Sequence, residues 1–506
     1  MHTIITTITQ AAATLRCRYL IPFFILLIGS ITARAGIWPA EGASLHYTLI
    51  GFSYPSTQGA HHYLLEIAEG HITREDSFQK AIVLEENSEA PRQIATVPHW
   101  AAAYTWRVTA MGSSGKAIGN TPFYHFSVQN IPYADTAQYR LRIVENDHTN
   151  KDLFLLVDCN RVLYSADGQP LWCLPPLPGV NIDAPVRDMK LTPQHTITFI
   201  SNTQAYEVDY NGNLLWKAPD DGSVSGDSSE FYHHEFTRLP NGHYMIAGNQ
   251  YIRKYLPPAF AALYGSNNNV KQENGRYYAD VAYGTLIEYN SKKKVIWSWK
   301  SAQSFTDADL FAPVMFENDR VPGFHHNAFY FDIKNKVIYN SFRDIDRILK
   351  ISYPSGRLLA TYGRKGNSPG LYTGQHSCRI DSKGNLYLFN NNFSMNVSRE
   401  AQNVSSVMVL KEEPRDSLTL LSVFDCDIDN ETTVNAKGGG NVYELENGNM
   451  LVCMGTASRI FILGDNKVRW HAFVENKNEN RWLYRAIYRV GVIEGKEQLQ
   501  QLIFNK

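Results

Sequence analysis

Side chains that bind anions recur at one position of a repeated pattern in this chain. A histidine or an arginine stands eight residues before a turn that contains glycine or, once, histidine. The positions are Arg187 before His195, His234 before Gly242 and His376 before Gly384, with Phe324-His325-His326-Asn327 at the equivalent place in a further repeat. Imidazole and guanidinium groups with no nearby carboxylate would form an anion-binding cup suited to sulfate or phosphate esters.

Two returning strands are expected to add polar groups to this cup. A strand that starts at His325 and is followed by an antiparallel partner of similar length brings Arg343 back beside His325. Asn391 and Asn392 return beside His376 in the same way. The sequence therefore predicts that residues far apart in the chain meet at one end of several strands.

Three histidines in one place also permit metal binding, which is the rival interpretation. No H-x-H or H-E-x-x-H motif supplies two ligands from one element, and two arginines would repel a divalent cation. A single histidine that faces a channel is usually only hydrated, but the shared repeat position favours a functional site. The pairs His233-His234 and His325-His326 leave open which member of each pair faces the site.

The elements that position these residues form a repeat from about residue 137 onward. One hairpin type ends in tryptophan, as in residues 164–172 and 208–216, and a second contains an Asn-Gly or Lys-Gly turn, as in residues 239–242 and 381–384. Two hairpins in each period make a four-stranded sheet, and repeated sheets of this kind are typical of propeller blades. The sequence predicts an all-β fold with a six-bladed β-propeller over residues 137–506, rather than two stacked sandwiches. Inner strands of a closed ring meet around an axial channel, where Gly440 is expected to leave room.

Two segments precede the repeat. Residues 36–130 alternate in the strand period, and Ala103-Tyr104-Thr105-Trp106-Arg107-Val108 resembles a strand of a fibronectin or Ig-like β-sandwich. Residues 1–35 have the three-part organisation of a signal peptide: arginines, an apolar run, and Ala33-Arg34-Ala35 as a cleavage site. We therefore expect export, with an uncleaved anchor as the alternative.

The composition excludes several classes of protein. Apolar residues make up 44% and charged residues 19% of the 506 residues, which is globular rather than disordered, collagen-like or polytopic. Lys plus Arg number 48 against 49 Asp plus Glu, so the balance gives no sign of nucleic-acid binding.

The five cysteines after the signal contain no C-x-x-C motif, and Cys159 and Cys173 either form a bridge or stay buried thiols.

The site segments carry a resemblance to a known family. They are His234-Glu235 before Leu-Pro-Asn-Gly, Phe324-His325-His326-Asn327 with Arg343 eighteen residues after His325, and Gln375-His376 before Lys-Gly-Asn-Leu-Tyr-Leu-Phe-Asn-Asn. In order and spacing they resemble the bacterial arylsulfate sulfotransferases, over nearly the whole chain after the signal. The resemblance implies a periplasmic six-bladed propeller behind an N-terminal sandwich, with aryl sulfates as donors and no nucleotide cofactor or metal.

Carried over by position, the resemblance assigns a role to each site residue. His376 is similar to the histidine that is transiently sulfated, and His325, Arg343 and His234 resemble the residues that hold the sulfuryl group. Asn327 matches a further polar position. The chain departs from the family at Ser377, where aspartate is frequent, and it lacks the closely spaced cysteine pair that some members carry near the site.

Together these inferences predict an exported aryl sulfotransferase. Its partners would be a small-molecule aryl sulfate donor and a phenolic acceptor, with no nucleic acid and no membrane insertion after signal cleavage. Arg187 and Asn327 are expected to bind substrate, and Tyr232, Phe324 or Phe393 to stack on an aryl group. A homodimer through the sandwich or an exposed sheet edge stays open. The alternatives are a noncatalytic propeller scaffold and a metal-dependent lyase or hydrolase.

Overall fold

The computed structural model describes residues 36–505, apart from residues 182, 265–268, 312–322, 365–369, 394–403 and 430–434. The predicted signal peptide, residues 1–35, lies outside the described residues. Strands dominate what is described, so the predicted all-β class is confirmed. No helix within the described ranges is long and apolar enough to cross a membrane.

Residues 36–130, here called the N-terminal module, contain two sheets. The larger has the order β1-β8-β6-β3-β4 with β7 beside β6, and the smaller pairs β2 with β5. The bounds are β1 Ala43–Leu45, β2 Leu49–Ser53, β3 His62–Glu69, α1 Glu75–Ala81, β4 Ile82–Ser88, β5 Arg92–Thr96, β6 Ala103–Met111, β7 Ala117–Asn120 and β8 Tyr124–Val128. Tyr104, Trp106 and Val108 are buried, as their alternation predicts, because alternate side chains of a strand share one face.

The described residues after the module form six sheets, each built on four antiparallel strands. In the first three sheets the orders are β12-β11-β10-β35, β13-β14-β15-β16 and β17-β18-β20-β21, with β19 beside β20. Their bounds are β10 Leu153–Val157, β11 Val162–Ser165, β12 Pro170–Cys173, β35 Val490–Glu494, β13 Val186–Leu191, β14 Ile197–Ser201, β15 Gln204–Val208, β16 Leu214–Lys217, β17 Tyr232–Arg238, β18 Tyr244–Leu256, β19 Val270–Glu273, β20 Arg276–Tyr289 and β21 Val295–Lys300. The tryptophan hairpins predicted from the sequence supply the last strands of these sheets, because Trp172, Trp216 and Trp297 lie in β12, β16 and β21.

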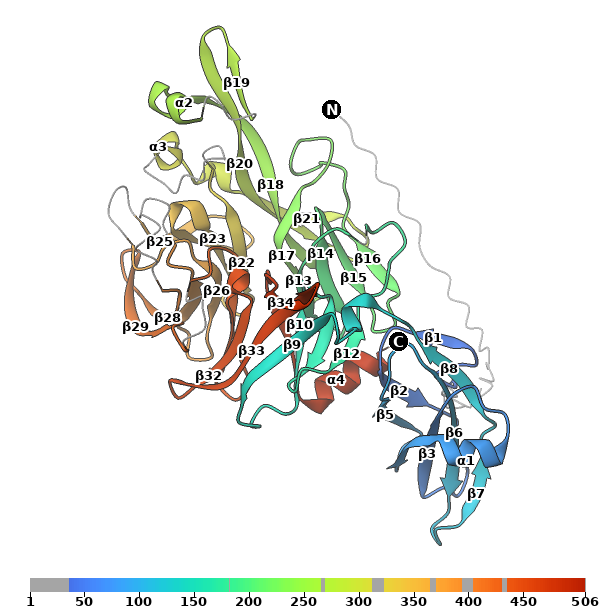
Figure 1. The fold of residues 1–506 in the computed structure, drawn as a ribbon. Helices are drawn as coiled ribbons and strands as arrows, with labels where there is room; N and C mark the ends of the chain where they lie inside the picture. Colours follow the sequence, from blue (N-terminus) through green and yellow to red (C-terminus); the bar gives the residue numbers. More distant parts are fainter. Residues whose placement is uncertain are drawn as a thin grey trace, which may run out of the picture.

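The remaining three sheets are β22-β23-β24-β25, β26-β27-β28-β29 and β30-β31-β32-β33, with β34 and β9 beside β33. Their bounds are β22 His326–Asp332, β23 Val337–Phe342, β24 Arg347–Ser352, β25 Leu358–Gly363, β26 His376–Ile380, β27 Leu386–Asn390, β28 Ser406–Glu413, β29 Ser417–Asp425, β30 Asn441–Glu444, β31 Met450–Cys453, β32 Arg459–Gly464, β33 Lys467–Asn478, β34 Arg481–Tyr484 and β9 Tyr139–Asn146. Short helices join some strands: α2 Pro258–Tyr264, α3 Asp307–Leu310, and the 3-10 turns Pro132–Ala134, Ser301–Gln303, Arg343–Ile345 and Gly455–Ala457. Figure 1 shows the long β18–β20 hairpin, with α2 and β19 at its tip, extending away from the six sheets.

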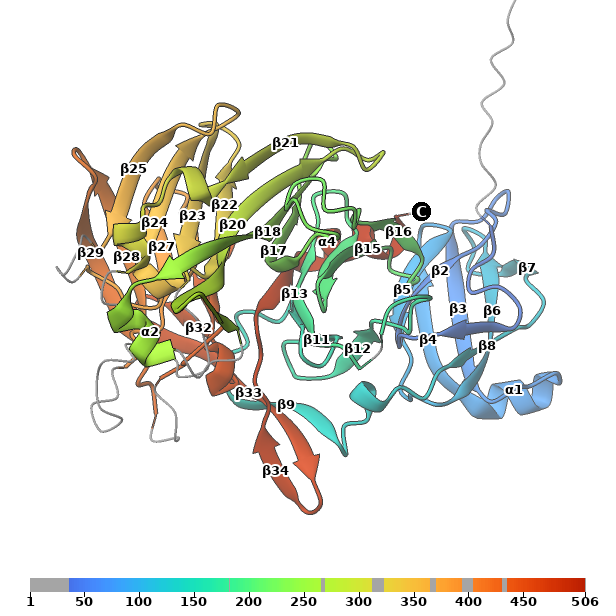
Figure 2. The ribbon, with the colours of Figure 1, turned by 90° about the horizontal axis from the view of Figure 1, so that it is seen from above.

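Each sheet has one inner strand, and the inner strands are neighbours of one another. In order they are β35, β13, β17, β22, β26 and β30. Asn441 in β30 connects to β35 as well, because its side-chain amide donates to Val490 O (2.9 Å) and accepts from Val490 N–H (3.1 Å). The C-terminal strand β35 pairs with β10 from the beginning of the repeat. Figure 2 shows the N-terminal module at one side of the six sheets.

Four inner strands have a bulge at corresponding positions. The pairing shifts register between Arg187 and Lys190 in β13, within residues 232–236 of β17, within 326–328 of β22 and within 376–378 of β26. Backbone φ angles are positive in or next to these bulges, at Asp188 (54°), His234 (63°), His325 (50°) and Ser377 (51°). A bulge changes the direction of side chains and is common next to functional sites.

The N-terminal module shares a hydrophobic core with the first two sheets. Buried residues of the module, such as Leu45 and Trp106, belong to the same cluster as Trp172 and Phe199. The C-terminal helix α4 (Gly495–Phe504) contributes Leu502 to this cluster. A Cβ at Gly51 would lie 2.4 Å from Ile503 Cγ2, so glycine permits the close approach of α4 to β2.

The cysteines within the described residues are all free thiols: Cys159, Cys173, Cys378, Cys426 and Cys453. The bridge between Cys159 and Cys173 that the sequence left open is therefore not formed. Four of the five are buried and pack as small hydrophobic side chains.

Candidate active site

His376 begins β26 and is held in one tautomer by Asn391. Its Nδ1 lies 2.7 Å from Asn391 Oδ1. Asn391 Nδ2 donates to the carbonyls of Ala436 (2.6 Å) and Gly439 (3.0 Å), so the amide oxygen faces the histidine. An amide oxygen only accepts, so Nδ1 of His376 carries the proton and Nε2 carries the lone pair. A neutral imidazole with a free Nε2 lone pair is chemically able to act as a nucleophile.

Burial and a neighbouring cation keep His376 neutral. Burial lowers the pKa of His376 to about 3, and the positive charge of Arg343 adds to this effect. Only 2% of the residue is exposed. A nucleophile that stays unprotonated at neutral pH is what attack on sulfur or phosphorus requires.

Arg343 lies beside His325, as the returning strand predicted. Its backbone N–H donates to His325 O (3.0 Å), and Nη2 donates to Lys437 O (3.2 Å). The prediction that the cup has no nearby carboxylate is wrong, because Asp344 follows Arg343. Asp344 Oδ1 lies 3.6 Å from Arg343 Nη1, and its Oδ2 lies 3.9 Å from His325 Nδ1. This carboxylate can balance a proton on His325.

His234 and His325 face each other across neighbouring sheets. Their ring centroids are 5.0 Å apart, and the Tyr488 ring lies 5.4 Å from that of His234. Burial lowers the pKa of His234 well below 6.5, and charge on His233, His325, His376 or Arg187 lowers it further. The Arg187 guanidinium lies 5.5 Å from the Tyr488 ring centroid. The structure thus brings Arg187, His234, His325, Arg343 and His376 together.

The second histidine of each pair has a different environment. His233 Nδ1 lies 2.7 Å from His234 Nδ1, so one ring donates to the other. His326 is 1% exposed and stacks on Phe342 with ring centroids 4.9 Å apart. Burial lowers the pKa of His233 to about 4 and that of His326 to about 3. The His234 and His325 rings are the closer pair, at 5.0 Å, whereas the His233 and His326 rings lie 6.3 Å apart and are both buried.

Asn327 lies in the β22 bulge and connects elements. Its Nδ2 donates to Gln375 O (2.7 Å), next to His376, and its backbone O accepts from Arg489 Nη2 (2.9 Å). Its Oδ1 has no hydrogen-bond partner within the described residues. Asn327 Nδ2 fixes the backbone before His376, whereas the buried Oδ1 can only accept a hydrogen bond, so contact of Asn327 with a sulfate oxygen stays a prediction.

Three other expectations about the surroundings need correction. Glycine is needed at position 440 because the Phe389 ring packs against it, and not because an open channel lies there. A Cβ at this position would lie 2.6 Å from Phe389 Cδ1. Tyr232 and Phe324 are fully buried core residues and are not available to stack on a substrate. Sequence reasoning missed Tyr488, which is the aromatic ring beside the histidines, because it lies in the irregular segment before β35.

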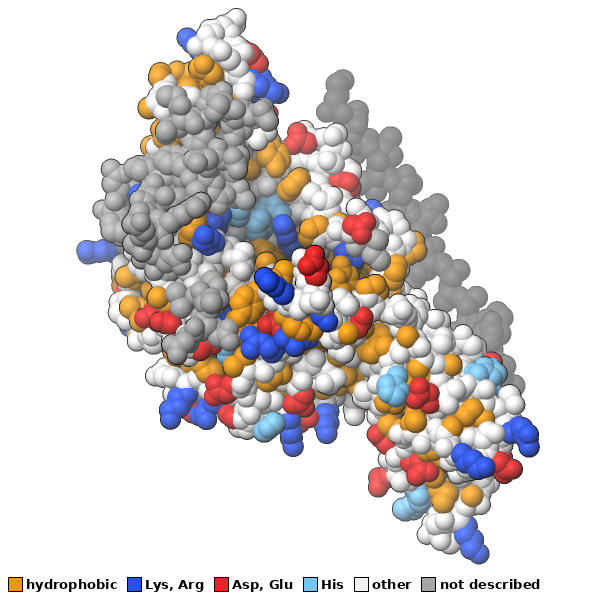
Figure 3. Space-filling model, viewed as in Figure 1, with side chains coloured by type: hydrophobic (Ala, Val, Ile, Leu, Met, Phe, Trp, Pro, Cys, Tyr) orange, Lys and Arg blue, Asp and Glu red, His pale blue; other side chains and the backbone are white. Residues whose placement is uncertain are grey.

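A cavity of about 480 Å³ adjoins this cluster through Arg187 and Tyr488, which line it. Its other charged residues are Arg161, Arg485 and Asp183, so cations outnumber anions around it. Figure 3 shows histidine side chains in a hollow on this face, with basic side chains nearby. Excess positive charge around a cavity attracts anionic ligands.

A group of buried ion pairs is formed by residues that directly follow site residues in the sequence. Asp188, Glu235 and Arg489 directly follow Arg187, His234 and Tyr488. Arg489 donates to Asp188 Oδ1 (2.9 Å) and to Glu235, and Lys190 Nζ donates to Glu235 Oε1 (2.6 Å). Burial opposes ionisation of Glu235, but Arg489 and Lys190 outweigh it and lower its pKa to about 2. These ion pairs hold three inner strands together beneath the site.

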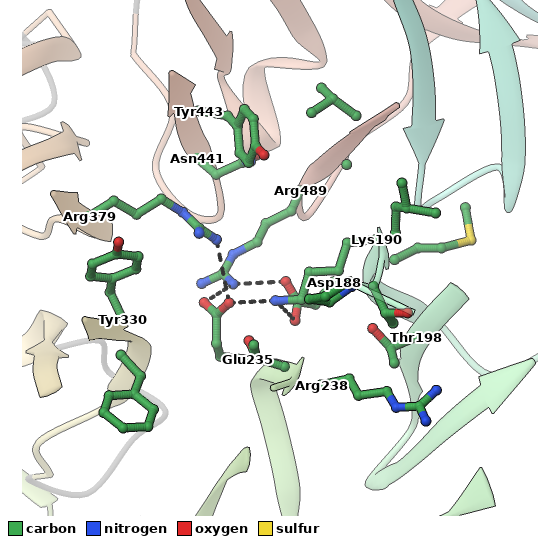
Figure 4. Close-up of a pocket in the computed structure, with 18 of the residues that line it drawn as sticks. Asp188, Lys190, Thr198, Glu235, Arg238, Tyr330, Arg379, Asn441, Tyr443 and Arg489 are labelled. Atoms are coloured by element: carbon green, nitrogen blue, oxygen red, sulfur yellow. Dashed lines mark hydrogen bonds and ion pairs between the residues drawn. The ribbon is translucent and has the colours of Figure 1, made fainter. Parts of the chain in front are cut away.

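The same ion pairs line a second cavity of about 330 Å³. Figure 4 shows Arg379, Arg489 and Lys190 converging on Glu235 and Asp188, with Tyr330 and Tyr443 nearby. Each cation in this group already has an acidic neighbour, with Arg379 Nη2 3.6 Å from Glu235. Cations outnumber anions by two around each cavity, so what distinguishes the second cavity is the acidic partner of each of its cations.

Comparison with known proteins connects this geometry to a chemistry. A family model described as Arylsulfotransferase (ASST) matches residues 132–459, which is most of the chain. The chain belongs to the arylsulfotransferase family. Arylsulfotransferase membership implies a sulfotransferase enzyme, and the matched range contains all the predicted site residues, from Arg187 to His376. No curated protein is similar enough to match the chain.

Solved structures resemble this arylsulfotransferase only distantly. A Bacteroides caccae protein of unknown function is 11% identical, covers 70% of this chain and 99% of its own, and has a TM-score of 0.38. A periplasmic gluconolactonase of Pseudomonas aeruginosa is 9% identical, with coverage of 71% and 99% and a TM-score of 0.33. An auxiliary nutrient binding protein of Bacteroides thetaiotaomicron is 8% identical, with coverage of 92% and 96% and a TM-score of 0.33. Similarities this low carry no functional argument.

Proposed function

We propose that this arylsulfotransferase moves a sulfuryl group from an aryl sulfate ester to a phenolic acceptor, through a sulfohistidine on His376 and without a nucleotide cofactor. The hydrogen bond between His376 Nδ1 and the fixed amide of Asn391 carries the proposal, because it leaves the Nε2 lone pair for attack. Arginines beside this histidine favour an anionic substrate over a bound metal ion.

In the first half-reaction His376 Nε2 forms a bond to sulfur as the bond from sulfur to the aryl oxygen breaks. The bonding electron pair leaves with the phenolate, which takes a proton from His325. Arg343 and His234 donate to the nonbridging oxygens of the sulfuryl group as charge shifts in the transition state. Asn391 Oδ1 stabilises the positive charge that develops on the His376 ring.

In the second half-reaction the acceptor phenol gives its proton to the same His325 ring. The phenol oxygen then forms a bond to sulfur while the sulfur–nitrogen bond breaks, which restores neutral His376. Two half-reactions at one site give ping-pong kinetics. The two half-reactions together consume no oxidant and need no nucleotide or metal.

Fold closure, location and assembly are part of the same proposal. The contacts from β35 through β13, β17, β22, β26 and β30 support a closed six-bladed propeller over residues 137–506. Residues 1–35 would direct export to the periplasm and be removed, and residues 36–130 would form a sandwich domain packed on the first two sheets. A homodimer through the module or an exposed sheet edge is compatible with these elements.

The test measures p-nitrophenol release from p-nitrophenyl sulfate with phenol as acceptor. We expect parallel lines in double-reciprocal plots, and a mass gain of about 80 Da on His376 when the acceptor is omitted. His376→Ala should reduce turnover at least roughly a thousandfold. The control His99→Ala changes an exposed histidine of the N-terminal module and should retain activity. Intersecting lines with no mass gain, or activity that survives His376→Ala, would overturn the proposal.

A further inference from the structure

A second group of ionisable side chains lies in the N-terminal module, away from the candidate active site. Glu41, His71 and His125 each offer a ligand atom, and these atoms lie within 4.8 Å of one another. Glu41 precedes β1, His71 follows β3 and His125 lies in β8. Three separate segments therefore bring together one carboxylate and two imidazoles.

His125 is oriented as a metal ligand usually is. Its Nε2 lies 3.0 Å from Ile72 O, and a carbonyl only accepts, so Nε2 carries a proton. Metal-binding histidines commonly donate the other ring N–H to a carbonyl or carboxylate, which fixes the tautomer. Nδ1 is then the coordinating nitrogen, and it faces Glu41 Oε1 at 2.9 Å. Two electron-pair donors this close need a proton or a metal cation between them.

The positions of Glu41 and His71 are also fixed by hydrogen bonds. The backbone N–H of His125 donates to Glu41 Oε2 (2.9 Å), which holds the carboxylate over the ring. The loop with His71 is tied to Thr105, whose Oγ1 accepts from Ile72 N–H (2.8 Å) and donates to Gly70 O (2.7 Å). Thr105 is fully buried, so this support is rigid. A preorganised set of ligands binds a metal without a large ordering cost.

His71 completes the set from above the His125 ring. The two rings are stacked with centroids 3.8 Å apart and planes within 7°. His71 is exposed, so rotation about its side-chain bonds can direct a ring nitrogen toward His125 Nδ1 and Glu41 at low cost. Imidazole and carboxylate ligands suit zinc and related divalent transition metals rather than calcium or magnesium.

We propose that Glu41, His71 and His125 form a binding site for a divalent transition metal ion of the zinc class in the N-terminal module. Three protein ligands leave a fourth coordination position for water or an added ligand. The metal would join the β3–α1 loop to β8 and to the turn before β1. The site is independent of the proposed transfer reaction, so either proposal can fail alone.

The test titrates zinc chloride into the full chain after treatment with a chelator and desalting, followed by calorimetry and thermal unfolding. We expect zinc to raise the unfolding temperature, because a ligand that binds only the folded state stabilises it. His71→Ala and Glu41→Gln should each weaken this zinc binding roughly tenfold or more. The matched control is His61→Ala, an exposed histidine of the same module, which should bind zinc as the unchanged chain does.

X-ray absorption at the zinc edge provides a second measurement that does not depend on activity or folding. Two imidazole nitrogens and a carboxylate oxygen should surround the zinc, and His71→Ala should lose one imidazole. Zinc affinity that is equal in the unchanged chain and His71→Ala would overturn the proposal. So would the absence of any zinc-dependent shift in the unfolding temperature of the unchanged chain.

Discussion

At the residue scale, the histidines of the candidate site differ because their ring nitrogens have different partners. His376 donates through Nδ1 to Asn391 and keeps its Nε2 lone pair. His234 shares a hydrogen bond with His233, and His325 lies near Asp344. In the proposed reaction His376 would be the nucleophile, His234 a hydrogen-bond donor and His325 the proton carrier.

Replacing Asn391 tests the tautomer argument. Asn391→Ala removes the acceptor for Nδ1–H, and we expect kcat/KM to fall roughly 10- to 100-fold through the loss of one hydrogen bond near the developing charge. Asn391→Asp keeps an acceptor but adds a negative charge, which should raise the pKa of His376 and move the acid limb of the pH profile upward. Steady-state rates across pH measure both. An unchanged rate in Asn391→Ala would contradict the positioning role.

Buried neutral histidines also predict how stability depends on pH. Burial lowers the pKa of His46, His326 and His376 to about 3, whereas the same side chains in the unfolded chain titrate near 6.5. Between these values the unfolded chain binds more protons, so stability falls as pH falls from about 6.5 toward 3, by about 1.4 kcal/mol per pH unit for each histidine. Urea unfolding at several pH values measures this slope.

The control for this prediction removes one contributor outside the active site. His46 Nε2 lies 3.2 Å from Tyr210 O, and glutamine can donate a similar hydrogen bond. His46→Gln should therefore make the slope shallower by the contribution of one histidine. A slope that is the same in both proteins would show that His46 is not held neutral.

At the element scale, the bulges of the inner strands decide where the site residues lie. A regular strand alternates its side chains between two faces, and an extra residue breaks that alternation. The bulges at Arg187, His234 and His376 occur at one end of β13, β17 and β26. Arg187 and His234 are thereby brought together at the site while Asp188 and Glu235, the next residues, join the buried ion pairs beneath it.

Substitutions of Ser377 test how much the β26 bulge contributes to stability. Its φ of 51° lies in the left-handed region, which costs a non-glycine residue of the order of 1 kcal/mol. We expect Ser377→Gly to be neutral or slightly stabilising and Ser377→Val to destabilise by about 1–3 kcal/mol, because β-branched residues fit this conformation poorly. Ser377→Ala is the matched control for loss of the hydroxyl. Urea unfolding ranks the three, and a valine variant as stable as the alanine variant would contradict the argument.

At the scale of the whole molecule, the first and last parts of the chain are tied together. The Asp158 carboxylate accepts from the backbone N–H groups of Asp188 (3.3 Å), Tyr488 (3.1 Å) and Arg489 (2.8 Å). It is buried, and burial raises its pKa to about 7. The loop after β10 thus holds both β13 and the segment before β35, which also positions Tyr488 at the site.

The shared core predicts that the N-terminal module and the first sheets unfold together. Leu502 in α4 is fully buried in that core, and Leu502→Ala should destabilise by about 2–5 kcal/mol through lost contacts and a cavity. Calorimetry should show one transition for the module and the sheets, shifted as a whole to lower temperature. The exposed leucine Leu483 provides the control, because Leu483→Ala should change stability little. Two separate transitions, with only one shifted, would contradict the coupling.

The strands and the meeting of Arg343 with His325 could be predicted because they depend on local rules. Alternating apolar residues, glycine turns and tryptophan hairpins each act within about ten residues, so the strand repeats follow from the sequence. Asp344 and Tyr488 could not be assigned in this way, since no local pattern shows that they approach His325 and His234. The need for glycine at position 440 likewise comes from its packing against Phe389, a contact that no local pattern predicts.

By itself, the sequence determined the all-β class, the repeat and the residues that could carry sulfuryl transfer, because these follow from periodicity, turn residues and side-chain chemistry. The tertiary structure decided that the His234 and His325 rings approach more closely than those of His233 and His326, which nitrogen of His376 holds the proton, and that Cys159 and Cys173 stay apart. Those outcomes depend on bulges that change the register of a strand and on hydrogen bonds between separate segments, such as that from His376 in β26 to Asn391, which follows β27. Contacts of this kind follow from the packing of whole sheets, which no single segment specifies.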